Sequence, residues 1–94
     1  MFVAVVCEYS GEDHRETVMQ LLQQYGFHRV YDNLFESFTI KEQTLSRLKR
    51  DLDRATDSFG GFRFYQFPLE ETLTITELAK KKWKRILLKS SEGE

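Results

Sequence analysis

Apolar and polar positions in the first third of the chain change from a continuous run to a helical period. Residues 2–9 (FVAVVCEY) are almost unbroken apolar and β-branched, which predicts a central strand buried on both faces. From Asp13 to Tyr25 apolar side chains recur at positions i, i+3, i+4 and i+7, which predicts an amphipathic helix. Gly26 follows where helices commonly end in a left-handed residue. The pattern therefore predicts a strand followed by a helix.

Residues 27–67 contain further segments with a strand pattern and one with a helical period. Residues 27–31 and 34–38 are aromatic and β-branched and flank a turn pair, so they predict two short strands. Thr39 and Glu42 form a Thr-x-x-Glu capping box, which predicts the start of a second helix. The core face of that helix is expected to carry Leu45, Leu48, Leu52 and Ala55. Residues 62–67 alternate as a strand that Pro68 stops.

The predicted order over residues 1–67 is β-α-β-β-α-β, the ferredoxin-like arrangement of the α+β class. Both helices would pack on one face of a mostly antiparallel four-stranded sheet. Because Phe and Tyr are frequent in these strands, we expect a partner chain to cover the other face. Residues 1–67 are thus predicted to form the core of one domain.

Residues 68–89 form a C-terminal extension beyond that core. Thr72–Thr76 alternates and favours a strand, whereas the periodicity of Glu77–Lys89 fits either a helix or a strand. In both cases the extension offers apolar side chains, so it is predicted to contact the partner subunit of a dimer. Residues 90–94 are predicted to be a flexible end.

Composition narrows the classes of protein that the chain can represent. With 94 residues, 40% of them hydrophobic, the chain suffices for one packed domain. The single Cys7 excludes an internal disulfide and suits a reducing compartment. The opening apolar run ends at Glu8 and is too short for a signal peptide or a membrane span. We expect a cytoplasmic protein without a membrane partner.

Basic side chains gather in two places although the net charge is −1. Residues 80–89 contain no acid and six basic residues, which are Lys80, Lys81, Lys82, Lys84, Arg85 and Lys89. A second group, the stripe of Arg47, Arg50 and Arg54, has the i, i+3, i+7 spacing of one helical face. Both groups predict contacts with nucleic-acid phosphates. The alternative for each group is an ordinary solvated surface. For the stripe this alternative is supported by Asp51 and Asp53, which lie between the arginines.

Glu8 is the candidate for chemistry because it ends a strand that is otherwise apolar. A carboxylate in that position is costly unless it is exposed, paired or bound to a metal. The alternative is that Glu8 has no chemical role and is an exposed acid at the end of a strand. Ser10 could orient a water or phosphate, but the N-cap of the first helix is favoured for it. His14 and His28 lack the spacing of a zinc site, and we find no phosphate loop or nucleophilic triad.

Two segments of the sequence resemble the CRISPR-associated protein 2 family. Residues 5–10 (VVCEYS) are similar to the family's opening strand, which ends in an acid followed by Ser. Residues 25–36 (YGFHRVYDNLFE) are similar to the family string of Tyr-Gly, Arg-Val-Gln and Ser-Val-Phe-Glu. The direct matches are Tyr25, Gly26, Arg29, Val30, Phe35 and Glu36, while Tyr31 and Asn33 depart. The resemblance extends over residues 1–67.

The resemblance implies a homodimer that acts in CRISPR spacer acquisition, bridges copies of the integrase and binds duplex DNA. Family members are also described as metal-dependent endoribonucleases or DNases that share Mg²⁺ between strand-end Asp residues of two subunits. Glu8 stands where the family has Asp, so it is the implied catalytic residue and metal ligand. The alternatives are a toxin-type endoribonuclease of similar fold and a generic ferredoxin-like interaction module.

Overall fold

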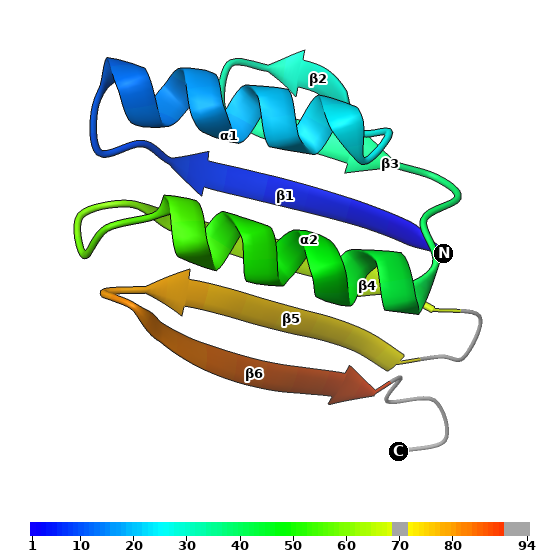
Figure 1. Ribbon diagram of the computed structural model, residues 1–94. Coiled ribbons are helices and arrows are strands. Elements are labelled where there is room, and N and C mark those ends of the chain that lie inside the picture. Colours follow the sequence, from blue (N-terminus) through cyan, green and yellow to red (C-terminus); the bar gives the residue numbers. More distant parts are fainter. Residues whose placement is uncertain (69–71, 90–94) are drawn as a thin grey trace.

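Two helices and six strands make up the part of the chain that the computed structural model describes, residues 1–68 and 72–89 (Figure 1). Their bounds, in chain order, are β1 (Phe2–Glu8), α1 (Glu12–Gln24), β2 (His28–Tyr31), β3 (Leu34–Ser37), α2 (Glu42–Ala55), β4 (Gly61–Phe67), β5 (Thr72–Ala79) and β6 (Lys82–Lys89). The predicted flexible end, residues 90–94, lies outside the described residues.

All the described strands join one antiparallel sheet in the order β2-β3-β1-β4-β5-β6. Both helices lie on the same face of this sheet, and β5 and β6 extend beyond the edge of α2 (Figure 1). The predicted α+β class with two helices on one face is therefore confirmed. The sheet has two strands more than the four that were predicted for residues 1–67.

The core lies between the two helices and the sheet, and it contains the apolar residues that the periodicity places on the inner faces. Leu45, Leu48 and Leu52 of α2 are each at most 1% exposed, as predicted from their i, i+3, i+7 spacing. The other core residues are Val3, Val5, Cys7, Val18, Leu22, Phe27, Phe35, Ile40, Phe62, Phe64 and Leu78. Burying one Leu side chain contributes about 2 kcal/mol, so this core is the main source of stability.

Both predicted N-cap residues are wrong. The N-cap of α1 is Gly11 rather than Ser10, and the N-cap of α2 is Lys41 rather than Thr39; neither helix has a side-chain cap. The side chain of Ile40 is buried in the core, so the chain enters the core before α2 begins. Tertiary burial therefore overrides the capping box. At the other end of α1, Gly26 has a φ of 86°, which confirms the predicted left-handed residue.

The C-terminal extension forms a hairpin in the chain's own sheet. Residues 82–89, whose pattern fits either a helix or a strand, form a strand because each pairs with a residue of β5. β5 in turn pairs with β4 of the same chain, from Gly61↔Ala79 to Gln66↔Thr74. The extension thus packs on its own chain here, which differs from the expected packing on a partner. A further contact with a second copy stays a prediction.

Candidate functional site

The face of the sheet that the helices leave uncovered changes from charged at one end to apolar at the other. Residues paired across antiparallel strands point to the same face, so the register defines rows that run across the sheet. The first row is Glu8, Gly61, Ala79 and Lys82; the second is Val6, Arg63, Glu77 and Lys84. The third row is Ala4, Tyr65, Ile75 and Ile86. The fourth row contains the pair Phe2 and Phe67, from β1 and β4, and the pair Leu73 and Leu88, from β5 and β6.

Aromatic rings dominate the apolar end of this face. The Phe2 ring centroid lies 5.1 Å from that of Phe38 and 5.7 Å from that of Phe67. Phe38 is 66% exposed, and Phe67 is 46% exposed. Further along the same end, Ile86 and Leu88 of β6 are exposed as well. A contiguous apolar face of this kind is typical of an interaction surface.

A cleft of about 600 Å³ lies at the charged end. Its lining includes Glu8, Arg63, Glu77 and Lys80 together with the loop of residues 58–60. Gly61, which pairs with Glu8, places no side chain beside that carboxylate. A Cβ at Gly61 would lie only 2.8 Å from the carbonyl oxygen of Leu78, so this close approach of two strands requires glycine.

Arg63 is the most unusual residue of this cleft. Its Nε lies 3.4 Å from Oε2 of Glu77, yet this nitrogen is buried and makes no hydrogen bond within the described residues. The guanidinium also lies over the Tyr65 ring, 5.8 Å from the centroid. Sequence analysis missed Arg63 and Glu77. The alternation of β4 contains the signal for Arg63, because it lies between the buried Phe62 and Phe64 and must point to the opposite face.

Within residues 1–68 and 72–89, a single copy of the chain does not gather a set of magnesium ligands around Glu8. The described residues contain no group of three or more His, Cys, Asp or Glu side chains that could hold a metal ion. The neighbours of Glu8 in its row, Gly61 and Ala79, carry no oxygen ligands in their side chains. Mg²⁺ requires near-octahedral oxygen coordination, so the described donors of one copy do not by themselves satisfy this ion.

Cys7 lies next to Glu8 in the sequence but is not a nucleophile. It points toward the helices and is 5% exposed. Burial raises the pKa of its thiol to about 12, so it stays protonated at neutral pH.

The arginine stripe lies on α2, on the side away from the sheet. Arg47, Arg50 and Arg54 are all exposed. Arg54 Nη1 lies 3.6 Å from Oδ1 of Asp51, whose other oxygen accepts a hydrogen bond from the Tyr25 hydroxyl. Arg47 and Arg50 make no ion pair with any described residue. These two are the cations of the stripe that remain available to a ligand.

The structure divides the predicted basic cluster of residues 80–89 among three surfaces. Lys80 and Lys81 form the tight turn between β5 and β6, with φ values of 52° and 61°. Lys82 and Lys84 point to the uncovered face, whereas Arg85 points to the helix face. Strand alternation separates neighbours in this way. The side chains that the sequence places together therefore do not form one patch.

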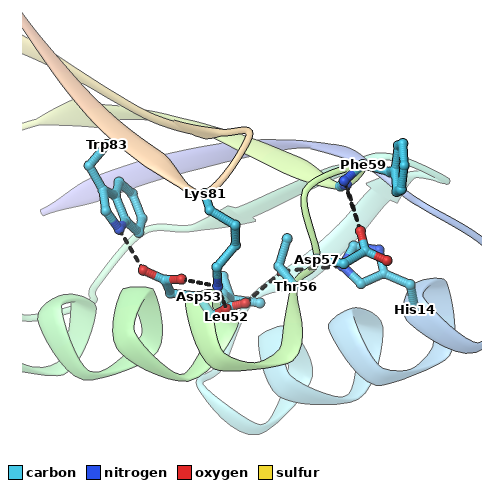
Figure 2. A network of polar contacts seen from close by, with 9 residues as sticks. His14, Leu52, Asp53, Thr56, Asp57, Phe59, Lys81 and Trp83 are labelled. Carbon is cyan, nitrogen blue, oxygen red and sulfur yellow. Dashed lines mark hydrogen bonds and ion pairs between the residues drawn. The ribbon is translucent and has the colours of Figure 1, made fainter.

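Lys81 contributes to structure rather than to a free basic surface. Its ammonium donates to the backbone carbonyl and the carboxylate of Asp53 near the C-terminal end of α2 (Figure 2). The indole Nε1 of Trp83 donates to the other oxygen of this carboxylate at 2.9 Å. Hydrogen bonds from Lys81 and Trp83 hold the pKa of Asp53 below its usual range. Asp53 thereby fixes the β5–β6 hairpin to the helix.

A second polar cluster joins α1 to the C-terminal end of α2 (Figure 2). His14 Nδ1 accepts a hydrogen bond from the Ser10 backbone N–H at 3.1 Å, and Nε2 lies 3.2 Å from Oγ1 of Thr56. The Thr56 hydroxyl donates to the Leu52 carbonyl at 2.6 Å, so Oγ1 accepts a hydrogen from Nε2. The imidazole is therefore neutral, and burial lowers its pKa.

A smaller concavity of about 290 Å³ lies on the helix face, between α2 and the strands β4, β5 and β6. Lys49 and Arg85 both line it. Burial, with a smaller effect from the Arg85 charge, lowers the pKa of Lys49 to about 8. Sequence analysis did not single out Lys49. The only sequence signal for it is a basic residue next to the buried Leu48.

Sequence comparison does not assign the chain to a family. No protein-family model matches the sequence, and no curated protein matches it. None of the helices in residues 1–68 and 72–89 is long and apolar enough to cross a membrane. The assignment of a function therefore depends on the geometry described above.

Proposed function

We propose that the protein is a homodimeric, nucleic-acid-binding subunit of the CRISPR spacer-acquisition type, with a ferredoxin-like core in residues 1–67. The observation that carries this proposal is the uncovered sheet face, with its apolar end and its rows of opposite charge. The strand order β2-β3-β1-β4 and the two helices on one face support the ferredoxin-like core. The integrase remains the expected protein partner, as the resemblance implies.

The charge pattern of the uncovered face favours a second copy as its partner. A two-fold axis parallel to the strands and between β4 and β5 would place Arg63 of one copy opposite Glu77 of the other. The same axis would place Glu8 opposite Lys82 and would stack the two apolar ends. A self-complementary patch of this kind is the requirement for a two-fold interface.

The dimer is tested with two variants that differ only in the face they change. Leu87 and Leu88 are adjacent on β6 and are 51% and 49% exposed, but they point to opposite faces of the sheet. We expect Leu88→Glu to convert a dimer into a monomer in size-exclusion chromatography with light scattering, because it buries a charge in the interface. Leu87→Glu is the matched control and should remain a dimer. A monomeric wild type at micromolar concentration would refute the proposal.

Exposed cations on the helix side support binding of the nucleic-acid backbone. Arg47 and Arg50 lie on α2, which the proposed dimer leaves accessible, whereas Lys82 and Lys84 lie on the uncovered face and would be covered by the second copy. Contacts of this kind neutralise phosphates without reading bases. In a dimer the α2 surface occurs twice, so a duplex could contact equivalent arginines on both subunits.

A second candidate function is a magnesium-dependent endonuclease, and the exposed Glu8 at the edge of the cleft favours it. Here the dimer axis would pass near Glu8 and bring two carboxylates together, in place of the Glu8–Lys82 pairing. Cleavage of labelled RNA and duplex DNA with Mg²⁺ tests this function. Loss of cleavage in Glu8→Ala, with a gain in Glu8→Asp, would support it. Binding without cleavage in every protein would leave only the binding function.

A further inference from the structure

The concavity on the helix face has the composition of an anion site. Residues of α2 form one wall of it, and residues of β4, β5 and β6 form the other. Its polar lining is rich in hydrogen-bond donors, which are Ser46, Lys49, Gln66, Thr74, Thr76 and Arg85. Glu42, near the start of α2, is the one acid that lines it. Donors that converge on one space favour a ligand with several acceptor oxygens.

Lys49 is held at the base of this concavity. Its ammonium donates to Oε1 of Gln66 at 2.6 Å and lies 5.3 Å from the centroid of the Phe64 ring. The same Gln66 oxygen accepts a hydrogen bond from the Thr76 hydroxyl at 3.1 Å. An ammonium has three hydrogens, so two of those on Lys49 remain for a ligand.

The two cations of the concavity repel each other without a neutralising partner. Lys49 and Arg85 make no ion pair with any residue in the described ranges 1–68 and 72–89. Burial is the main reason that the pKa of Lys49 falls to about 8, Arg85 lowers it further, and Glu42 offsets only part of this effect. A bound anion would relieve both the repulsion and the desolvation of the ammonium.

We propose that this concavity binds a phosphate group between Lys49 and Arg85, with the hydroxyls of Ser46 and Thr74 as additional donors. If the proposed function is correct, the group is a phosphate of the bound nucleic acid, which would then contact the helix face beside β6. The chemistry is the same for an inorganic or terminal phosphate, and the experiment separates these sources.

The first arm of the test measures inorganic phosphate alone by isothermal titration calorimetry. Arg85→Gln and Lys49→Gln should each weaken phosphate binding about tenfold or more, because each removes one charge-assisted hydrogen bond. Arg29→Gln is the matched control, since Arg29 lies on β2 at the opposite edge of the sheet. Arg85 is exposed, so its replacement leaves the core intact.

Two outcomes would overturn the proposal: absence of phosphate binding by the wild type at millimolar concentration, or equal weakening by all three variants. The pH dependence supplies a separate readout. Relative to Lys49→Arg, the affinity of the wild type should fall between pH 7 and pH 9, because Lys49 loses its charge near pH 8 and Arg stays charged. The charge of phosphate itself, Glu42, Arg85 and the terminal amine of Met1, which also lines the concavity, are common to both proteins, so the ratio of their affinities isolates Lys49.

The second arm repeats the titration with duplex DNA. Parallel weakening of DNA and phosphate binding in Lys49→Gln would support a backbone phosphate as the ligand. Phosphate binding without any DNA binding would support the site while refuting the proposed function. DNA binding at wild-type strength in Lys49→Gln, with phosphate binding abolished, would support a free or terminal phosphate.

Discussion

Charged side chains of the same type have different roles in this protein, and their surroundings decide which. Lys81 is engaged by Asp53, and Lys49 is half-buried with a pKa of about 8. Arg47 and Arg50 are exposed and make no ion pair with described residues. A count of basic residues along the chain therefore overstates the surface that is available to nucleic acid.

The hydrogen bonds of His14 require its neutral form, so its protonation should affect stability. Its neutral ring accepts a hydrogen bond from the Ser10 backbone N–H and donates one to the Thr56 hydroxyl oxygen. These two bonds connect α1 to the end of α2. Protonation would place a hydrogen on Nδ1 against the Ser10 N–H. Asp57, the charged neighbour, partly offsets this cost, and its own pKa is low because backbone N–H groups of Phe59 and Gly60 bind its carboxylate.

The free energy of unfolding should depend on pH through His14. Its pKa is lower in the folded state than the ordinary value of 6.5, so the unfolded chain binds the proton more readily. The stabilisation is complete above pH 6.5 and is lost as the pH falls through the folded pKa. Urea unfolding at pH 8 and pH 5 measures this change.

His14→Gln is the control for that measurement, because Gln does not titrate. The difference in unfolding free energy between wild type and variant should shrink from pH 8 to pH 5. A difference that is the same at both pH values would show that His14 does not titrate in this range.

At the scale of elements, the β5–β6 hairpin is fixed by one carboxylate. Asp53 accepts hydrogen bonds from Lys81 and Trp83, and the Trp83 ring lies 6.1 Å from the centroid of Phe64. Both turn residues, Lys80 and Lys81, have a positive φ. In two-residue β-hairpin turns this conformation is usually adopted by Asn or Gly. The hydrogen bonds to Asp53 compensate for that strain.

Asp53→Ala should loosen the hairpin. We expect a loss of about 1 kcal/mol in unfolding free energy, because charge-assisted bonds are worth more than this but these are partly exposed. Faster amide hydrogen exchange in β6 and a red-shifted Trp83 emission would be the local readouts. Asp51→Ala is the matched control on the same helix, and it should leave the Trp83 emission unchanged. Equal spectra for the two variants would contradict the role of Asp53.

At the scale of the whole molecule, the two faces of the sheet have different environments. Both helices lie on one face, with α1 toward β2 and β3 and α2 over β4 (Figure 1). The other face is left with an aromatic end and a charged end. The exposed arginines of α2 lie on the helix side, away from the uncovered face. A second copy on the uncovered face would therefore leave the arginine stripe accessible to a duplex.

Duplex binding should be strongly salt-dependent and insensitive to sequence. Arg50→Gln should reduce the slope of log affinity against log salt by about 0.9 for each phosphate that the variant no longer neutralises. Arg54→Gln should change the slope less, because Asp51 already neutralises part of its charge. The comparison is made by fluorescence anisotropy with two duplexes of different sequence. A slope that Arg50→Gln leaves unchanged would exclude α2 from the binding surface.

Local periodicity was enough to predict both helices and the first four strands. Leu45, Leu48 and Leu52 recur at the helical period, and they are buried because only that face meets the sheet. The position of Glu8 at the exposed end of a strand could also be predicted, because it ends the apolar run of β1. These features depend on neighbours in the sequence, so the sequence alone contains them.

Tertiary structure decided the features that depend on residues distant in the chain. The pattern of residues 82–89 fits a helix or a strand, and pairing with β5 makes it a strand. The start of α2 lies after the predicted cap because Ile40 is buried in the core. Lys49 and Arg85 line one concavity only because β6 pairs beyond the edge of α2. Arg63 and Glu77 likewise become neighbours through the register of β4 with β5. Periodicity describes one element at a time, whereas a site requires the register between elements.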